Sequence, residues 1–254
     1  MAGMEQLAFT GRGTPKNPQP NLLLEYCLKE QIEMLAVQLP GRAGRISERP
    51  YKNAREIASS ALSVLTPKLT EKSCEYAICA HSMGALCAFE FVQLAAQTNI
   101  PLPVHIFISC MLSPDTPVEL RPWKPAKFCS SDELKEEVRS WGANDIVFRP
   151  DVWESYEELF RSDFAVFDEY LYDESSTPLS IPSTLFYATR DSRITTKLMR
   201  GWKKLLSNDK LGDEVEFVGI NGTHSFFYQT AAREQWMKCI IAKVDLILLD
   251  LVYG

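Results

Sequence analysis

The 254-residue sequence lacks a strong charge bias, a long apolar run and a leader-like beginning. Its net charge of −6 gives no sign of the basic surface that a nucleic-acid-binding protein needs. No apolar run approaches the roughly 18 residues that cross a bilayer. The first residues have neither the charged nor the apolar region of a secretory signal. We therefore expect no nucleic-acid partner, no membrane span and a cytoplasmic location.

Paired cysteines are also missing. The seven cysteines are odd in number and form no C-x-x-C motif, which argues against a disulfide framework and against a zinc site. Reduced thiols in this pattern are typical of a cytosolic protein. Cys79 lies inside an apolar run, where burial raises the pKa of a thiol, so it is a poor nucleophile candidate.

Apolar runs alternate with helical patterns along the chain. Strands are predicted at 34–39, 76–80, 104–109, 183–188 and 214–219, with a weaker candidate at 5–9. Helices are predicted at 21–29, from 53, from 86, at 195–206 and at 231–251, and a glycine- and proline-rich loop at 10–20. Continuous apolar strands separated by helices indicate a mostly parallel sheet with helices on both faces. The length suits one domain over residues 1–254.

The segment 126–175 interrupts this alternation with aromatic helices. Ser130 begins a capping box whose helix ends at Gly142, and Asp151 is a candidate cap for a second helix with aromatic residues on its apolar side. Because the segment lies between two strands of one sheet, we interpret residues 126–175 as a helical lid insertion. The alternative is an ordinary pair of packed helices with its aromatic side chains in the core.

The stretch Ala80-His-Ser-Met-Gly84 joins a predicted strand to a predicted helix with almost no room to turn. Such an elbow exposes the hydroxyl of its apical residue, Ser82, as a nucleophile. The backbone N–H of Met83 then points to where an oxyanion would form. The alternative is that Ser82 merely caps the helix.

A nucleophilic serine needs a base and an acid that orients the base. The chain has three histidines. His81 lies on the opposite side of the elbow and His105 lies inside a predicted buried strand, so elimination leaves His224, in the loop after the last strand. Asp191 follows the preceding strand and completes the order Ser82, Asp191, His224. The alternatives are a surface histidine and an acid at a helix N-terminus. Gly11, in the early loop, is the candidate for a second oxyanion donor.

Four stretches resemble the type II (external) thioesterases, which are stand-alone α/β-hydrolases serving polyketide, nonribosomal peptide and fatty acid synthases. They are Leu35-Ala-Val-Gln-Leu-Pro-Gly-Arg42, His81-Ser-Met-Gly-Ala-Leu-Cys-Ala-Phe-Glu90, Arg161-Ser-Asp-Phe164 and Gly222-Thr-His-Ser-Phe-Phe227. The family's catalytic residues correspond to Ser82, Asp191 and His224. The resemblance implies an acyl thioester substrate on the phosphopantetheine arm of an acyl carrier protein or on CoA, and no metal or cofactor. We expect a monomer.

Three departures from the family keep alternatives open. Ala80 replaces the usual glycine, Thr10 and Arg12 replace residues of the oxyanion loop, and the N-terminus is abbreviated. One alternative is a catalytically impaired hydrolase-fold protein that binds a carrier protein or an acyl chain. The others are a medium-chain fatty acyl chain-releasing thioesterase and a general carboxylesterase. The basic residues of helix 195–206 are a candidate contact for an acidic carrier protein, although a solvated helix face would look the same.

Overall fold

The computed structural model describes residues 9, 11–14, 17–71, 74–206 and 215–253. The chain divides into two compact units, of which one comprises residues 1–49 and 226–254 and the other residues 50–225. That one hydrolase domain spans residues 1–254 stays a prediction.

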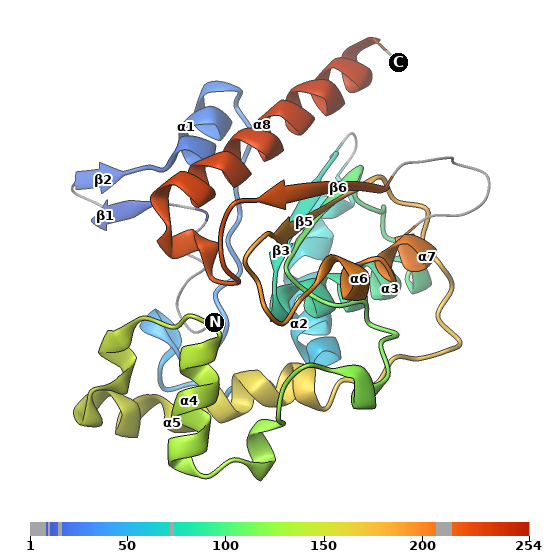
Figure 1. Cartoon of the computed structure of the whole chain (residues 1–254). Helices are drawn as coiled ribbons and strands as arrows, with labels where there is room; N and C mark the ends of the chain where they lie inside the picture. The colour runs from blue at the N-terminus through green and yellow to red at the C-terminus, as the bar shows by residue number, and fades with distance from the viewer. Residues whose placement is uncertain (1–8, 10, 15–16, 72–73, 207–214, 254) are drawn as a thin grey trace. The chain divides into compact units, whose positions relative to one another are not determined.

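A four-stranded parallel sheet forms the centre of the unit 50–225 (Figure 1). Its strands are adjacent in the order in which the chain makes them: β3 (Ala77–His81), β4 (His105–Ser109), β5 (Ser183–Ala188) and β6 (Val215–Ile220). All five residues of β4 are buried, as expected of a parallel strand covered on both faces. The register pairs Ile108 with Leu185, and Phe186 with Val218. Because the strands are parallel, their carboxyl ends meet at one edge.

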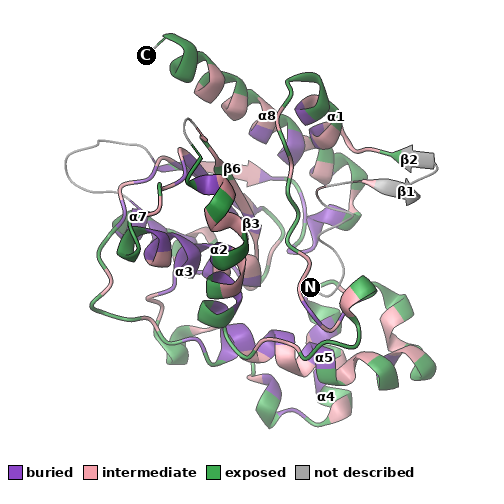
Figure 2. Cartoon of the chain, turned by 180° about the vertical axis from the view of Figure 1, so that it is seen from behind, coloured by how far each residue is buried: buried purple, intermediate pink, exposed green. Residues whose placement is uncertain are grey.

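Helices surround this sheet. α2 (Ala54–Leu69), capped by Asn53, packs against α3 (Met83–Gln97). Ten residues of α3 are buried, and Figure 2 shows this helix as mostly interior. The predicted insertion contains η4 (Ala126–Phe128), α4 (Ser131–Ser140), η5 (Asp145–Phe148) and α5 (Pro150–Asp168), and η3 (Val118–Leu120) precedes it. The short helices α6 (Thr196–Met199) and α7 (Trp202–Leu206) follow β5.

The other unit is built around a long C-terminal helix. α8 (Thr230–Tyr253) packs against α1 (Leu22–Lys29), and the Tyr26 hydroxyl donates to Asp245 over 2.6 Å. The unit also holds the antiparallel strands β1 (Arg12–Thr14) and β2 (Asn17–Gln19) and the short helices η2 (Ala43–Arg45) and η6 (Phe226–Tyr228). The described chain has no helix long and apolar enough to span a bilayer.

Two predictions for the N-terminal region are wrong. Residues 34–39 form no strand, and the side chains of Leu35 and Val37 are about half exposed, at 54% and 51%. A strand needs a neighbour for its backbone groups, and no described strand pairs with this run. The segment predicted as a loop at 10–20 instead contains β1 and β2. Most of the weak strand candidate at 5–9 lies outside the described residues.

Two helix predictions need smaller corrections. Helix 195–206 is divided at Gly201 into α6 and α7, and Lys204 there forms an ion pair with Asp115. α5 begins at Pro150 after a cap residue, Arg149, that makes no side-chain capping bond. Asp151 therefore lies in the first turn and does not cap the helix. Proline suits this position because its fixed φ is already helical.

Candidate active site

Ser82 occupies the turn between β3 and α3. Its backbone angles are φ 52° and ψ −129°, a conformation that L-residues rarely adopt. The Ser82 N–H donates to the carbonyl of Ser109 over 2.8 Å, which ties the turn to the end of β4. The Ser82 side chain makes no capping bond to α3. The alternative that this serine merely caps the helix is therefore wrong.

His224 follows β6 and is 5% exposed. Its Nε2 lies 2.9 Å from Ser82 Oγ and its Nδ1 lies 2.8 Å from Asp191 Oδ2. The alternative that His224 is a surface histidine is therefore wrong. The other two histidines are accounted for, because His105 is buried and bonded to Thr184 over 2.9 Å. Burial, and then the proximity of His224, hold the pKa of His81 well below its ordinary value.

Asp191 lies in the turn after β5. Its Oδ1 accepts hydrogen bonds from the N–H groups of Arg193 and Ile194, both over 2.9 Å. Burial raises the pKa of Asp191, but the hydrogen bond and charge of His224 and these two N–H groups together bring it below its ordinary value. Thr195 caps α6, so Asp191 is not that helix's N-terminal acid.

The side chains of Ser82, His224 and Asp191 form a row at the carboxyl edge of the sheet, and two hydrogen bonds connect them. If Nδ1 of His224 carries the proton and donates to Asp191, Nε2 has a free lone pair that accepts the Ser82 hydroxyl. An imidazole in this state can take the serine's proton, and the carboxylate stabilises the imidazolium that forms. The arrangement can therefore activate a serine for attack on a carbonyl carbon.

The two predicted oxyanion donors differ in their surroundings. Met83 is the first residue of α3, and the first N–H groups of a helix have no partner within it. Gly11 belongs to the unit 1–49 and 226–254 and has φ +87°. A Cβ there would lie 2.4 Å from the Gln19 carbonyl oxygen, so the local chain path already requires glycine. The oxyanion role of Gly11 stays a prediction.

Cys110 is a neighbour of this row that the sequence did not point to. Its Sγ, Asp191 and His224 place potential metal-ligating atoms within 4.8 Å of one another. Burial, and then the charge of Asp191, raise the pKa of this thiol, so it stays protonated and is a weak ligand. Burial likewise raises the pKa of Cys79. That the protein works without a metal stays a prediction.

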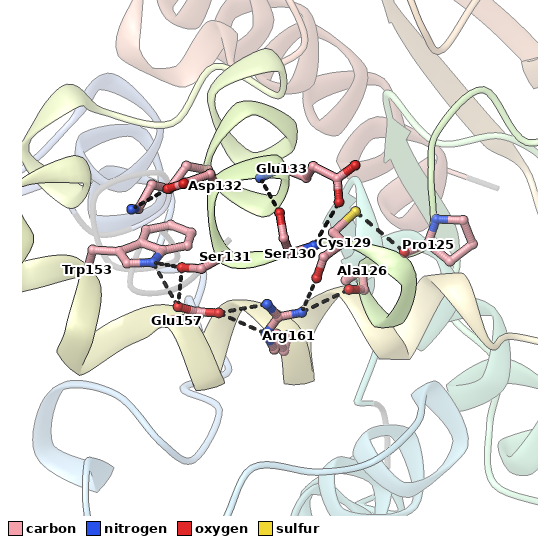
Figure 3. Close-up of polar contacts among 11 residues, drawn as sticks. Pro125, Ala126, Cys129, Ser130, Ser131, Asp132, Glu133, Trp153, Glu157 and Arg161 are labelled. Atoms are coloured by element: carbon pink, nitrogen blue, oxygen red, sulfur yellow. Dashed lines mark hydrogen bonds and ion pairs between the residues drawn. The ribbon is translucent and has the colours of Figure 1, made fainter.

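The helical segment after β4 is internally well connected. Arg161 of α5 donates to the carbonyls of Ala126 and Cys129 over 2.9 and 3.1 Å and to Glu157 (Figure 3). The indole N–H of Trp153 lies 2.9 Å from both Ser131 Oγ and Glu157. The predicted capping box at Ser130 is confirmed. α4 and α5 are therefore held together by side chains from both helices.

Most aromatic side chains of this segment are packed. Five of the predicted ones are buried: Trp153, Phe160, Phe164, Phe167 and Tyr170. The last turn of α4 reaches the Ser82–His224–Asp191 row, where the ring centroids of Trp141 and His224 lie 4.6 Å apart. No local sequence pattern pointed to Trp141. Packing explains the buried aromatics, and the lid role of residues 126–175 stays a proposal.

Comparison with known proteins gives a consistent result. The family model for the thioesterase domain matches residues 24–244. The chain is 27% identical over 203 residues to the gramicidin S biosynthesis protein GrsT of Aneurinibacillus migulanus, covering 79% of this chain and 75% of that protein. It is 26% identical over 220 residues to the human medium-chain S-acyl fatty acid synthase thioesterase, covering 84% and 77%.

Solved structures with the same fold include RedJ, a thioesterase from the prodiginine pathway of Streptomyces coelicolor. The TM-score is 0.73 at 24% identity, covering 87% of this chain and 83% of that one. YbtT, a type II thioesterase from the yersiniabactin pathway, gives 0.68 at 22% identity, covering 91% and 88%. With the parallel sheet and its surrounding helices, these likenesses confirm the predicted α/β-hydrolase fold.

Proposed function

The chain belongs to the thioesterase domain family, and we propose that it hydrolyses acyl thioesters with Ser82 as nucleophile, His224 as base and Asp191 as the acid that orients the base. The observation that carries this proposal is the His224 ring, bonded to Ser82 Oγ on one side and to Asp191 on the other. A protein that only binds acyl chains has no need for these three groups in register.

The geometry of the row supports the following sequence of steps. His224 takes the hydroxyl proton as Ser82 Oγ attacks the thioester carbonyl carbon, and the N–H of Met83 stabilises the oxyanion. The tetrahedral species collapses and the C–S bond breaks. His224 gives its proton to the leaving sulfur, which departs as the thiol. His224 then removes a proton from water, which attacks the acyl-serine, releases the free acid and restores the serine.

The substrate class comes from the relatives. GrsT is named for gramicidin S biosynthesis, and YbtT is described as a type II thioesterase from a pathway of nonribosomal peptide and polyketide synthesis. We propose that this chain acts on acyl chains held by the phosphopantetheine arm of a carrier protein, or on the matching acyl-CoA. Lys197 of α6 and Arg200, which caps that helix, are exposed and offer positive charge to an acidic carrier.

The second candidate function is release of medium-length fatty acyl chains, which the likeness to the fatty acid synthase thioesterase favours. On either function we propose that residues 126–175 act as a lid and Gly11 as a second oxyanion donor. We further propose that the protein acts as a monomer. We also propose that it acts in a reducing compartment, since all seven cysteines are free thiols.

The test measures thiol release from acetyl and decanoyl thioesters, on carrier protein and on CoA, by wild type and Ser82→Ala. Turnover that disappears in the variant is the expected result. Preference for the short chain on carrier protein would indicate editing, and preference for the long chain would indicate chain release. Absence of turnover, together with retained carrier binding and no labelling of Ser82 by a fluorophosphonate, would replace the enzyme with a binding protein.

A further inference from the structure

Trp141, the residue that caps the C-terminus of α4, contacts His224 through its side chain and the neighbouring Ser225 through its backbone. The Trp141 ring meets the His224 imidazole edge-on, with the planes at 73° and the centroids 4.6 Å apart. The Trp141 carbonyl accepts the hydroxyl of the next residue, Ser225, over 2.6 Å. At Gly142, with φ +78°, a Cβ would lie 3.1 Å from Ser225 Cβ. The loop after β6, which carries His224 and Ser225, is thus in close contact with the end of α4.

Glu137 holds the Trp141 ring from the other side. Its carboxylate accepts a hydrogen bond from the indole N–H of Trp141 over 3.2 Å. It also accepts hydrogen bonds from both terminal nitrogens of Arg193, over 2.6 and 3.1 Å. The Arg193 guanidinium also lies over the Trp141 ring, 5.0 Å from its centroid. The Glu137 and Arg193 side chains are 12% and 20% exposed, so water screens this pair less than a surface pair.

Arg193 connects this assembly to the acid as well. Its backbone N–H donates to Asp191 Oδ1, while its side chain also donates to the Pro122 carbonyl over 3.0 Å and to Ser140 Oγ over 2.7 Å. One residue therefore helps to hold the carboxylate that orients the base, and also the helix end that packs on the base.

We propose that Trp141 is a positioning residue for His224, and that Glu137 and Arg193 form a clamp that holds the Trp141 ring in place. The inference rests on the proposed function, since it assigns a role in the reaction of the same row. Rotation of the imidazole would lose the bond to Ser82 or the bond to Asp191. The indole occupies space beside the imidazole and opposes that rotation. A base displaced by about 1 Å can cost about 100-fold in rate.

The clamp belongs to a firmly connected helix pair. α4 is tied to α5 through Ser131, Trp153, Glu157 and Arg161 (Figure 3). α5 in turn contacts α3, the helix that begins at the Ser82 elbow. The base is thus supported by the same helical body that packs on the nucleophile's helix, so the seating of α4 determines where His224 points.

The test compares substitutions in the clamp with matched ones outside it. Trp141→Leu and Trp141→Phe are paired with Trp202→Leu, which removes a buried tryptophan of α7 whose indole N–H donates to the Met111 carbonyl. Glu137→Gln is paired with Glu136→Gln, the same change at a neighbouring residue whose ion pair with Arg139 is on the surface. Each variant is measured for kcat, KM, melting temperature and the rate of Ser82 labelling by a fluorophosphonate.

We expect Trp141→Leu to lower kcat and the labelling rate about 10- to 100-fold with little change in KM. Trp141→Phe should recover part of the loss, and Glu137→Gln should lose about 3- to 10-fold. The low-field proton resonance of the His224–Asp191 bond should broaden or shift in these variants. Trp202→Leu should lower the melting temperature but leave kcat of the folded protein unchanged, and Glu136→Gln should change neither.

A Trp141→Leu protein with wild-type kcat, labelling rate and proton resonance would overturn the inference, whatever its melting temperature. If Trp141→Leu does not fold, Glu137→Gln decides in the same way. If wild type hydrolyses no thioester, the proposed function fails, but the labelling rate and the proton resonance still decide whether Trp141 positions His224.

Discussion

Replacing Asp191 with asparagine separates geometry from charge within the row. The Oδ1 of the new side chain can still accept the N–H groups of Arg193 and Ile194, so the turn after β5 keeps both of its bonds. In place of Oδ2, the amide presents N–H groups to Nδ1 of His224. The imidazole then carries its proton on Nε2, and Ser82 loses its acceptor.

We expect Asp191→Asn to lower kcat about 10⁴-fold, the loss measured for the same change in a Ser-His-Asp protease. At 1.36 kcal/mol for each factor of ten this is about 5 kcal/mol of transition-state stabilisation. KM should stay close to wild type, because the Asp191 side chain is 2% exposed and does not face a substrate. The fold should survive because both backbone bonds are kept.

The pH dependence of stability supplies a second readout. The folded-state pKa of Asp191 lies below the ordinary value of 3.8. Its carboxylate therefore stabilises the wild type above that value, and the contribution is lost as the pH falls through the folded pKa. The asparagine variant should lack this part of the acid-range loss in urea denaturation.

Thiol release from an acyl thioester measures the rate, and Asp173→Asn is the matched control, because Asp173 is exposed and its carboxylate accepts hydrogen bonds from Ser175 in its own turn. An Asp191→Asn enzyme that retains more than a tenth of wild-type kcat would refute the reasoning, because Asp191 would then not set the tautomer of His224. Equal losses in both variants would point to a general effect of the substitution.

Two stability predictions follow from the surroundings of particular residues. Gly201→Ala places a Cβ 2.6 Å from Ser113 Cβ and should cost about 1–3 kcal/mol in urea denaturation, whereas Gly84→Ala has nothing within 4 Å and should be neutral or slightly stabilising. Burial raises the pKa of Asp168 to about 6, partly offset by the bond from the Ala126 N–H. Wild type should therefore gain stability relative to Asp168→Asn, on the order of 2–3 kcal/mol, as the pH falls from 7 towards 4.

The parts of the fold that the sequence predicted correctly depend on neighbours in the chain. The elbow at Ser82 follows from an apolar strand running directly into an apolar helix. The capping box joins Ser130 to Glu133, three positions along the chain, and is present. His224 could be proposed as the base because the chain has so few histidines and one of them follows the last strand.

The prediction at 34–39 shows where this reasoning fails. An apolar run indicates burial, but a strand also needs a neighbouring strand to satisfy its N–H and C=O groups. The presence of such a neighbour depends on residues far away in the sequence, and among the described residues none pairs with this run. The loop prediction at 10–20 was wrong in the opposite direction. Prolines and glycines there indicate a loop, but the segment contains the two short strands β1 and β2.

Local sequence patterns do not predict the clamp of Glu137 and Arg193, but the pattern of α4 contains one indication of it. Leu134, Val138 and Trp141 lie on the buried stripe of the helix, at the spacing of three and four residues that 3.6 residues per turn produces. Glu137 lies on the same side, while Glu136, one residue earlier, is turned about 100° away, and its side chain is 73% exposed. A carboxylate within an apolar stripe requires a buried cation or donors. The sequence could therefore have indicated that Glu137 has such a partner, but its identity, Arg193, comes from 56 residues away and depends on the fold bringing α4 to the Asp191 turn.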